Sequence, residues 1–553
     1  MKDPKILAML QRMTLREKIY QTICHHADES FYQSDPQALR RYAQEKPYGA
    51  FFVGEEIIGN APVEGEQVQA AIREYRQVAA IPPLFSADVE FGCGYMFRDK
   101  SRCGNYPWQM TLGATGSVAL AYEYGKYTAL DARDIGVNWA FAPVCDINYN
   151  YLNPVVNTRA FGDRAPLVAD LSEAVVRGMQ DYGLAATAKH FPGDGTDHRD
   201  QHFVMTSNWF STEKWMKTYG AVYRRLIAAG VSTVMVGHIS LPAYERERFA
   251  GVALPGSLSH ELMTGLLKQE LGFEGIVVSD AVCMNGFRVF YQPQVEAELH
   301  CFAAGCDVLL WPSPEYPAAL EERLLAGEIP MERLEDAVYR VLSVKARFGL
   351  LGEPAAAFPQ EDRRPSLTLD DRISRAGVTL VWDKTGLLPL RDARRVVVIA
   401  LTPNADEFAS LHTLQEALAE NGVEAILYQG ECPADDWPAC DAIVYVTFCH
   451  QHRPTIHLDV ATSWQTASYQ REKVIAVALG SPYLLSTHFE TVPAAVAAYS
   501  DTPGAQRAVA DALCGRIPFA GRLPVRLPDA QLWQDIVARM SAPDEWEGAG
   551  CTY

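Results

Sequence analysis

The chain is 553 residues long, which exceeds a single typical domain and predicts two or three. Its 48% hydrophobic and 21% charged residues are those of an ordinary globular protein and exclude a disordered or fibrous one. The formal net charge is −19, from 49 Lys and Arg against 68 Asp and Glu, and no basic block occurs, so neither nucleic acid nor a membrane surface is an expected partner.

The N-terminus and the cysteines predict a cytoplasmic protein. The opening segment 1–9 lacks the uninterrupted apolar core of a secretory signal, and no stretch approaches the length of a membrane span. The 12 cysteines are scattered without a Cys-x-x-Cys pair. In a chain of this size without an export signal, we expect them to be reduced.

Residues 1–351 alternate strand-like apolar runs with helical patterns. Apolar strands with helical crossovers are typical of a parallel sheet, and about seven or eight repeats favour a TIM-like (β/α)8 barrel over a doubly wound open sheet. The expected strands are 49–53, 83–87, 139–144, 185–189, 233–236, 276–278 and 307–310. The expected helices include 167–181, 213–229, 258–271 and one that opens with the capping-box pattern Thr14-Leu-Arg-Glu17.

A second domain follows the barrel. The segment 352–375 opens with Gly-Glu-Pro-Ala-Ala-Ala-Phe-Pro and predicts a linker. Another strand–helix alternation over 376–553 predicts a smaller α/β sandwich domain. Its expected strands are 378–381, 395–400, 442–446 and 474–479, with a helix at 411–421.

Two of the apolar runs in the first domain end in residues suited to acid–base chemistry. One run leads into a Pro-Gly turn that begins with Lys189 and His190, and Asp200 and His202 follow shortly after. The other run ends in Asp280. Because barrel strands present their chemistry at their carboxyl ends, we expect these distant segments to meet in one site.

Each of these residues also has a structural explanation. Asp280 could be the N-cap of a following helix, and His202 could be a histidine with satisfied hydrogen bonds. The His and Asp side chains between 190 and 202 suggest zinc, but the spacing of known metal motifs is missing, so we expect no metal and no cofactor.

In its motifs and their order, the chain resembles the family 3 glycoside hydrolases. The pattern Lys-His-Phe-Pro-Gly-x-Gly followed by Asp-x-His spans 189–202, and Ser-Asp-x-x-x-Met spans 279–284. Further matches are Met13–Ile19, Pro107–Met110, Phe141–Asp146, Asn157–Gly162, Leu271–Gly275, Gly386–Leu390 and Gly521–Val525. The resemblance therefore spans nearly the whole chain.

The resemblance implies the β-N-acetylglucosaminidase type of that family. This type takes its general acid from the histidine of Asp-x-His, present here as Asp200 and His202, whereas the β-glucosidase type uses a glutamate of the second domain. The corresponding segment here, 448–454, has no glutamate. Asp280 would be the nucleophile of a retaining reaction through a covalent glycosyl intermediate.

The resemblance also implies four sugar contacts: Lys189, His190, Arg159 and Asp88. Without it, a salt bridge at a strand end and a turn residue explain them equally well. The chain departs from the family near Asp88, where Phe91 replaces a glycine and an arginine is displaced to Arg98, and within the catalytic motif at Asp194 and Gln201. The exact sugar therefore stays open.

The expected function is hydrolysis of terminal β-linked N-acetylglucosamine from a small carbohydrate. Phosphorolysis is an alternative, because His202 does not repel phosphate as a carboxylate would. A β-glucosidase or β-xylosidase is favoured only if a second-domain residue such as Glu431 reaches the site. A sugar-binding protein without activity is not expected, since both the nucleophile and the acid are present. The oligomeric state stays open, a homo-oligomer included.

Overall fold

The computed structural model describes residues 2–32, 35–54, 64–97, 102–352, 358–430, 440–448 and 471–528. Its contacts divide the chain into two compact units. The first comprises Met1–Gly104, Ala121–Ile147 and Ser172–Leu367, and the second comprises Asn105–Leu120, Asn148–Leu171 and Thr368–Tyr553. None of the helices in the described ranges is both long enough and apolar enough to cross a membrane.

The first unit is built on eight parallel strands that close into a barrel, as predicted. In barrel order they are β4 (Trp139–Ala140), β3 (Leu84–Ala87), β2 (Ala50–Phe52), β1 (Ile23–His26), β12 (Val308–Leu310), β11 (Ile276–Ala281), β7 (Thr233–Val236) and β5 (Thr187–Phe191). The segment at β4 closes onto β5, because Ala140 N donates to Ala185 O and Cys145 N donates to Lys189 O, both at 2.8 Å. Every residue of β3, β5, β7, β11 and β12 is buried, as expected for strands that are covered on both faces.

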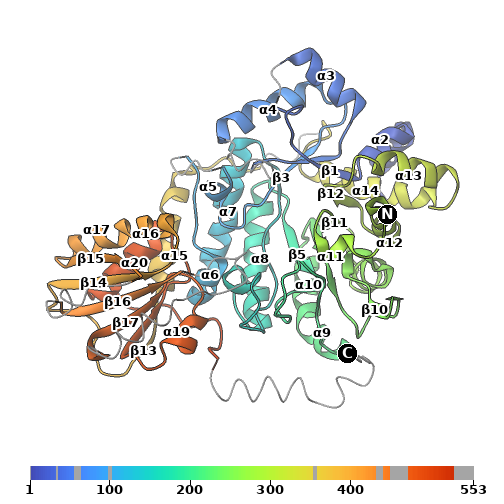
Figure 1. Cartoon of the computed structure of the whole chain (residues 1–553). Helices are drawn as coiled ribbons and strands as arrows, with labels where there is room; N and C mark the ends of the chain where they lie inside the picture. Colours follow the sequence, from blue (N-terminus) through green and yellow to red (C-terminus); the bar gives the residue numbers. More distant parts are fainter. Residues whose placement is uncertain are drawn as a thin grey trace. The chain divides into compact units, whose positions relative to one another are not determined.

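Helices surround these strands (Figure 1). They are α1 (Pro4–Arg12), α2 (Leu15–Tyr20), α3 (Pro36–Glu45), α4 (Gly65–Val78), α5 (Cys93–Met96), α7 (Val118–Ile135), α8 (Ala165–Asp181), α9 (Thr212–Lys217), α10 (Tyr219–Ala228), α11 (Asn285–Arg288), α12 (Gln294–Ala304), α13 (Tyr316–Leu325) and α14 (Met331–Arg347). The predicted capping box is present at the start of α2. The single helix predicted over 213–229 is two helices, because Thr218 has non-helical backbone angles between α9 and α10.

The second unit is a sheet covered on both faces. Its strand order is β13 (Thr379–Asp383), β18 (Ala494–Ala497), β17 (Val474–Ala478), β16 (Ala442–Thr447), β14 (Arg395–Leu401) and β15 (Glu424–Gln429), with β13 antiparallel to its neighbour. Along β14, Val396 and Val398 join the core under α17 (His412–Glu420) and α20 (Pro503–Leu513), whereas Val397 and Ile399 join the core under α19 (Tyr483–His488). This alternation produces the predicted α/β sandwich (Figure 1).

The second unit also contains two segments that the sequence analysis assigned to residues 1–351. Segments 105–120 and 148–171 cluster with it, and the chain crosses between units at Leu367, inside the predicted linker 352–375. Helix α15 (Leu369–Gly377) already occupies the end of that linker and packs on α6 (Gln109–Thr115). Their approach is close, since a Cβ added to Gly377 would lie 2.7 Å from Cγ2 of Thr111.

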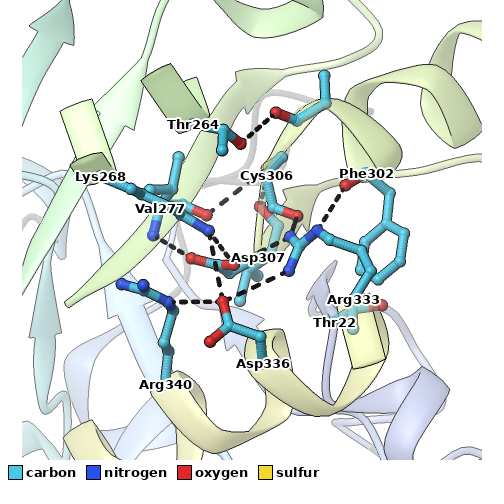
Figure 2. Close-up of polar contacts among 12 residues, drawn as sticks. Thr22, Thr264, Lys268, Val277, Phe302, Cys306, Asp307, Arg333, Asp336 and Arg340 are labelled. Carbon is cyan, nitrogen blue, oxygen red and sulfur yellow. Dashed lines mark hydrogen bonds and ion pairs between the residues drawn. The ribbon is translucent and has the colours of Figure 1, made fainter. Parts of the chain in front are cut away.

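A buried charge cluster holds the amino ends of β11 and β12 (Figure 2). Asp307, fully buried before β12, contacts Lys268 Nζ at 2.7 Å and Arg333 Nη2 at 2.9 Å, and it accepts a hydrogen bond from Val277 N at 2.9 Å. Burial alone would raise the pKa of Asp307, but the two cations outweigh it and hold that pKa below its ordinary value. Burial lowers the pKa of Lys268 to about 8.

Replacing Asp307 by Asn should destabilise the first unit, because two buried cations lose their counter-charge. We expect a loss of about 3 kcal/mol in the free energy of unfolding, seen as a thermal midpoint lowered by about 5 °C or more at pH 7. Since the pKa of Asp307 is lowered by folding, its stabilisation is present at neutral pH and is lost as the pH falls through the folded value. Asp336→Asn, at a half-exposed carboxylate 4.0 Å from Lys268 Nζ, is the control and should shift the midpoint far less.

Candidate active site

Charged and polar side chains lie at the carboxyl ends of five barrel strands. Because all eight strands are parallel, these ends lie at one rim of the barrel, here called the carboxyl rim. Its residues are Asp88 and Glu90 after β3, Asp146 after β4, Lys189 and His190 on β5, His238 after β7, and Asp280 on β11.

Lys189 is held between two carboxylates. Its Nζ atom lies 2.9 Å from Asp88 Oδ1 and 2.5 Å from Glu90 Oε1. Lys189 and Glu90 are buried, whereas 41% of the Asp88 side chain is exposed. The structure thus brings together two of the predicted sugar contacts and adds Glu90, whose only signal in the sequence is its position two residues after Asp88.

His190 is oriented by a carboxylate that the sequence analysis did not select. Asp146 is fully buried and lies 2.7 Å from His190 Nδ1. The same carboxylate accepts hydrogen bonds from the backbone N–H of His190 at 3.2 Å and of Asp194 at 2.8 Å. Since a carboxylate accepts, Nδ1 is the donor, which leaves Nε2 of His190 for other partners. The sequence feature that could have identified Asp146 is its position at the end of the matched segment Phe141–Asp146.

Asp200 and His202 form the predicted dyad. Nδ1 of His202 lies 2.6 Å from Asp200 Oδ1, and the backbone N–H of His202 donates to the same oxygen at 2.8 Å. The Asp200 carboxylate therefore fixes the ring orientation and stabilises the imidazolium form. Asp200 is buried, whereas 27% of the His202 side chain is exposed.

The loop that carries this dyad is fixed to the barrel at His202 and at a short strand that follows it. The carbonyl oxygen of His202 accepts a hydrogen bond from Asn285 N, which follows the strand of Asp280, at 3.3 Å. Further along the loop, β6 (Thr206–Ser207) pairs in parallel with β8 (Ile239–Ser240). The dyad is thereby tied to the strand end that holds Asp280.

Asp280 is a buried carboxylate among imidazoles. Burial by itself would raise its pKa, but the electrostatic effect of the imidazoles of His190, His238 and His202 outweighs burial and holds the pKa of Asp280 below its ordinary value. One of its oxygens also accepts a hydrogen bond from Ala281 N at 2.8 Å. A short carboxylate that stays ionised at the end of a rigid strand suits a nucleophile.

His238 is a third residue that the sequence analysis did not select. Nε2 of His238 donates to the carbonyl oxygen of Ala281 at 3.1 Å, and Nδ1 lies 2.8 Å from Ser257 Oγ. Burial lowers the pKa of His238, so the neutral ring is favoured and it fixes the backbone next to Asp280. The sequence feature that could have identified His238 is its position, two residues after the predicted strand 233–236.

Arg159 is the one predicted sugar contact outside the first unit. It lies in the segment Asn148–Leu171 of the second unit, is buried, and its carbonyl oxygen accepts a hydrogen bond from Gln109 Nε2 at 2.7 Å. Its sugar contact stays a prediction. Arg98, Glu431 and the segment 449–454 lie outside the described residues.

The acidic residues near the dyad brace the loop. Asp197 contacts Arg199 Nη2 at 2.6 Å and accepts a hydrogen bond from Ser207 N at 3.0 Å. Burial would raise the pKa of Asp197, but Arg199 outweighs it and lowers that pKa. Within the described ranges, no group of three or more His, Cys, Asp or Glu side chains is arranged to hold a metal ion.

Comparisons with known proteins agree with this geometry. The model of the "Glycosyl hydrolase family 3 N terminal domain" matches residues 14–344. A "Beta-N-acetylglucosaminidase/beta-glucosidase" of Cellulomonas fimi is 34% identical over 494 residues, which are 82% of this chain and 86% of that protein.

Two solved structures share both units. A structure titled "Beta-glucoside phosphorylase BglX bound to 2FGlc" matches with a TM-score of 0.82 at 27% identity, covering 94% of this chain and 96% of that one. A family 3 β-N-acetylglucosaminidase from Paenibacillus sp. str. FPU-7 matches with a TM-score of 0.77 at 28% identity, covering 93% and 99%. With a barrel, a strand-end carboxylate and a family model that covers most of the first unit, this chain belongs to glycosyl hydrolase family 3 and is a glycoside hydrolase.

Proposed function

We propose that this protein is a retaining exo-β-N-acetylglucosaminidase. The observation that carries the proposal is the Asp200–His202 dyad, whose loop is hydrogen-bonded to the residues that follow Asp280. A retaining glycosidase needs a proton donor and a carboxylate nucleophile at one site, and this loop supplies the donor. The similarity to proteins named β-N-acetylglucosaminidases supports the same function.

The reaction proceeds in two steps. In the first, the His202 imidazolium gives its Nε2 proton to the glycosidic oxygen while Asp280 attacks the anomeric carbon, so the carbon–oxygen bond breaks and the aglycone leaves as an alcohol. In the second, neutral His202 takes a proton from water, whose oxygen attacks the anomeric carbon and releases Asp280. Two inversions give net retention of configuration.

The polar groups of the carboxyl rim hold the sugar. Asp88, which is partly exposed beside Lys189, accepts hydrogen bonds from vicinal hydroxyls, and Lys189 and His190 donate to hydroxyls of the sugar ring. Arg159 adds a fourth contact. Because Asp146 fixes the ring of His190, its donor geometry is set before the sugar arrives.

Phosphorolysis is the second candidate, favoured by the similarity to a structure titled as a beta-glucoside phosphorylase. A histidine acid–base group carries no negative charge, so phosphate can approach the glycosyl–Asp280 intermediate in place of water. A β-glucosidase activity is the third, because the Cellulomonas fimi relative is also named for it.

The described cysteines suit a cytoplasmic location, which we also propose. Cys301 and Cys306, whose thiols interact, form no disulfide. Neighbouring thiols that stay unpaired are typical of a reducing compartment.

A panel of β-linked nitrophenyl sugars, assayed with and without phosphate, tests the activity. We expect N-acetylglucosaminide to be cleaved fastest. Faster release in phosphate, with sugar 1-phosphate as product, would identify a phosphorylase. A preference for glucoside or xyloside would contradict the proposal and point to an acid in the second unit.

His202→Ala should slow substrates with poor leaving groups by about 100-fold or more, because the leaving oxygen then departs without a proton. Aryl sugars with strongly acidic phenols should be slowed far less in their first step. The measurement is kcat/KM across a series of aryl N-acetylglucosaminides of increasing phenol pKa. Equal losses along the series would exclude His202 as the general acid.

His190→Asn should move the acid limb of the kcat/KM profile to higher pH. The reason is that His190 is the largest of the charges that lower the pKa of Asp280, so that pKa should rise toward its ordinary value. The midpoint is measured with an activated aryl substrate. His198→Asn, at a largely exposed ring that does not contribute to the pKa of Asp280, is the control. An unmoved midpoint in His190→Asn would refute this electrostatic account.

A further inference from the structure

The side chain of Gln201, between the two members of the dyad, is buried without hydrogen bonds. Gln201 is 1% exposed. Neither its Oε1 nor its Nε2 atom has a hydrogen-bond partner among the residues that the structure describes, and neither atom is exposed to solvent. Leaving a buried polar group without a partner costs about 1–3 kcal/mol, and the great majority of buried amides in proteins are paired.

The barrel makes room for this amide at the carboxyl rim. A Cβ added to Gly237 would lie 3.0 Å from Oε1 of Gln201 and 3.1 Å from Cβ of His190. A side chain at Gly237 would therefore crowd both groups. The amide therefore lies against the backbone that follows β7, next to a histidine of the proposed sugar site.

Strand register brings this position level with the nucleophile. Val236, which precedes Gly237, pairs with Ser279 on β11, so Gly237 is in register with Asp280. On its other side, Val236 pairs with Phe191 on β5, directly after His190. The amide of Gln201 thus belongs to the same layer of the barrel as the groups that act on the sugar.

The fold alone does not require an amide here. A methionine of similar shape would fill the same space without unpaired polar atoms and should be at least as stable. A polar group that is costly to the fold but located among catalytic residues is expected to serve the site.

We propose that Gln201 is a specificity-determining residue whose carboxamide hydrogen-bonds a neutral polar group of the bound sugar. The inference rests on the proposed glycosidase function. A carboxamide offers one acceptor and two donors without charge, which suits a hydroxyl or an acetamido group and not an anion. Because the amide is buried against Gly237, the side chain of Gln201 must rotate away from Gly237 to contact the sugar. A movement of the Asp200–His202 loop accompanies this rotation.

The test is Gln201→Met, assayed on the aryl glycoside that the wild-type protein cleaves fastest. We expect a thermal midpoint equal to or above that of the wild type, together with a loss of about tenfold or more in kcat/KM. The loss should be the same for good and poor leaving groups, because the contact is to the sugar. A merely structural amide would change stability and leave kcat/KM unaltered.

Gln180→Met is the matched control. Gln180 is also buried, but its amide is satisfied, with Oε1 accepting from Ser232 N at 2.9 Å and Nε2 donating to Gly230 O at 2.9 Å. This variant should show the opposite pattern, a lowered thermal midpoint with kcat/KM retained.

Two results would overturn the inference. One is wild-type kcat/KM in Gln201→Met. The other is a loss that grows with the pKa of the leaving group, which would mean that Gln201 acts through His202. The assay uses whichever sugar the wild-type protein cleaves fastest, so it does not depend on that sugar being N-acetylglucosamine. A failure of the N-acetylglucosaminidase proposal would instead appear in the panel of nitrophenyl sugars tested on the wild-type protein.

Discussion

One buried carboxylate, Asp146, follows β4 and joins three groups on β5 and in the turn after it. It accepts from the ring and the backbone of His190 and from the backbone of Asp194. These bonds depend on the closure of the barrel, since Cys145, the residue before it, is hydrogen-bonded to Lys189. The closed sheet and the orientation of His190 are therefore parts of the same arrangement, and the turn that leads to the dyad starts from it.

Charge balance explains why the proposed nucleophile, Asp280, can stay ionised. Asp280 is buried, which disfavours a carboxylate, but three histidines lower its pKa. Lys189 in turn is buried between Asp88 and Glu90 and is compensated there. Each buried charge at the carboxyl rim thus has a counter-charge or an imidazole ring beside it. An active site that excludes water requires this, because an uncompensated buried charge is costly.

The sequence predicted the barrel and much of its site because both leave local signals. Buried parallel strands are continuous apolar runs, and residues such as Lys189 and Asp280 follow such runs directly. Strand β1 was missed, because Ile23-Cys-His-His26 is short and half of it is polar. Strand β15 was missed for a similar reason, since only one of its six residues, Ala425, is buried at the edge of the sheet.

Other features depend on contacts between distant segments and left no such signal. Asp146 and His238 are single polar residues after apolar runs, which are common in any α/β protein, and their roles appear only through partners far along the chain. The assignment of 105–120 and 148–171 to the second unit is likewise a matter of packing, not of composition. The unpaired amide of Gln201 is a property of its surroundings alone.

The central claim is that Asp280 forms a covalent bond with the sugar. A 5-fluoro glycosyl fluoride of N-acetylglucosamine slows both steps and lets such an intermediate accumulate, so it can be detected by mass spectrometry of the intact protein and of its peptides. The account predicts one added sugar, located on the peptide that contains Asp280 and absent in Asp280→Asn. A sugar attached to a different carboxylate, or turnover with no adduct and with inversion of configuration, would contradict it.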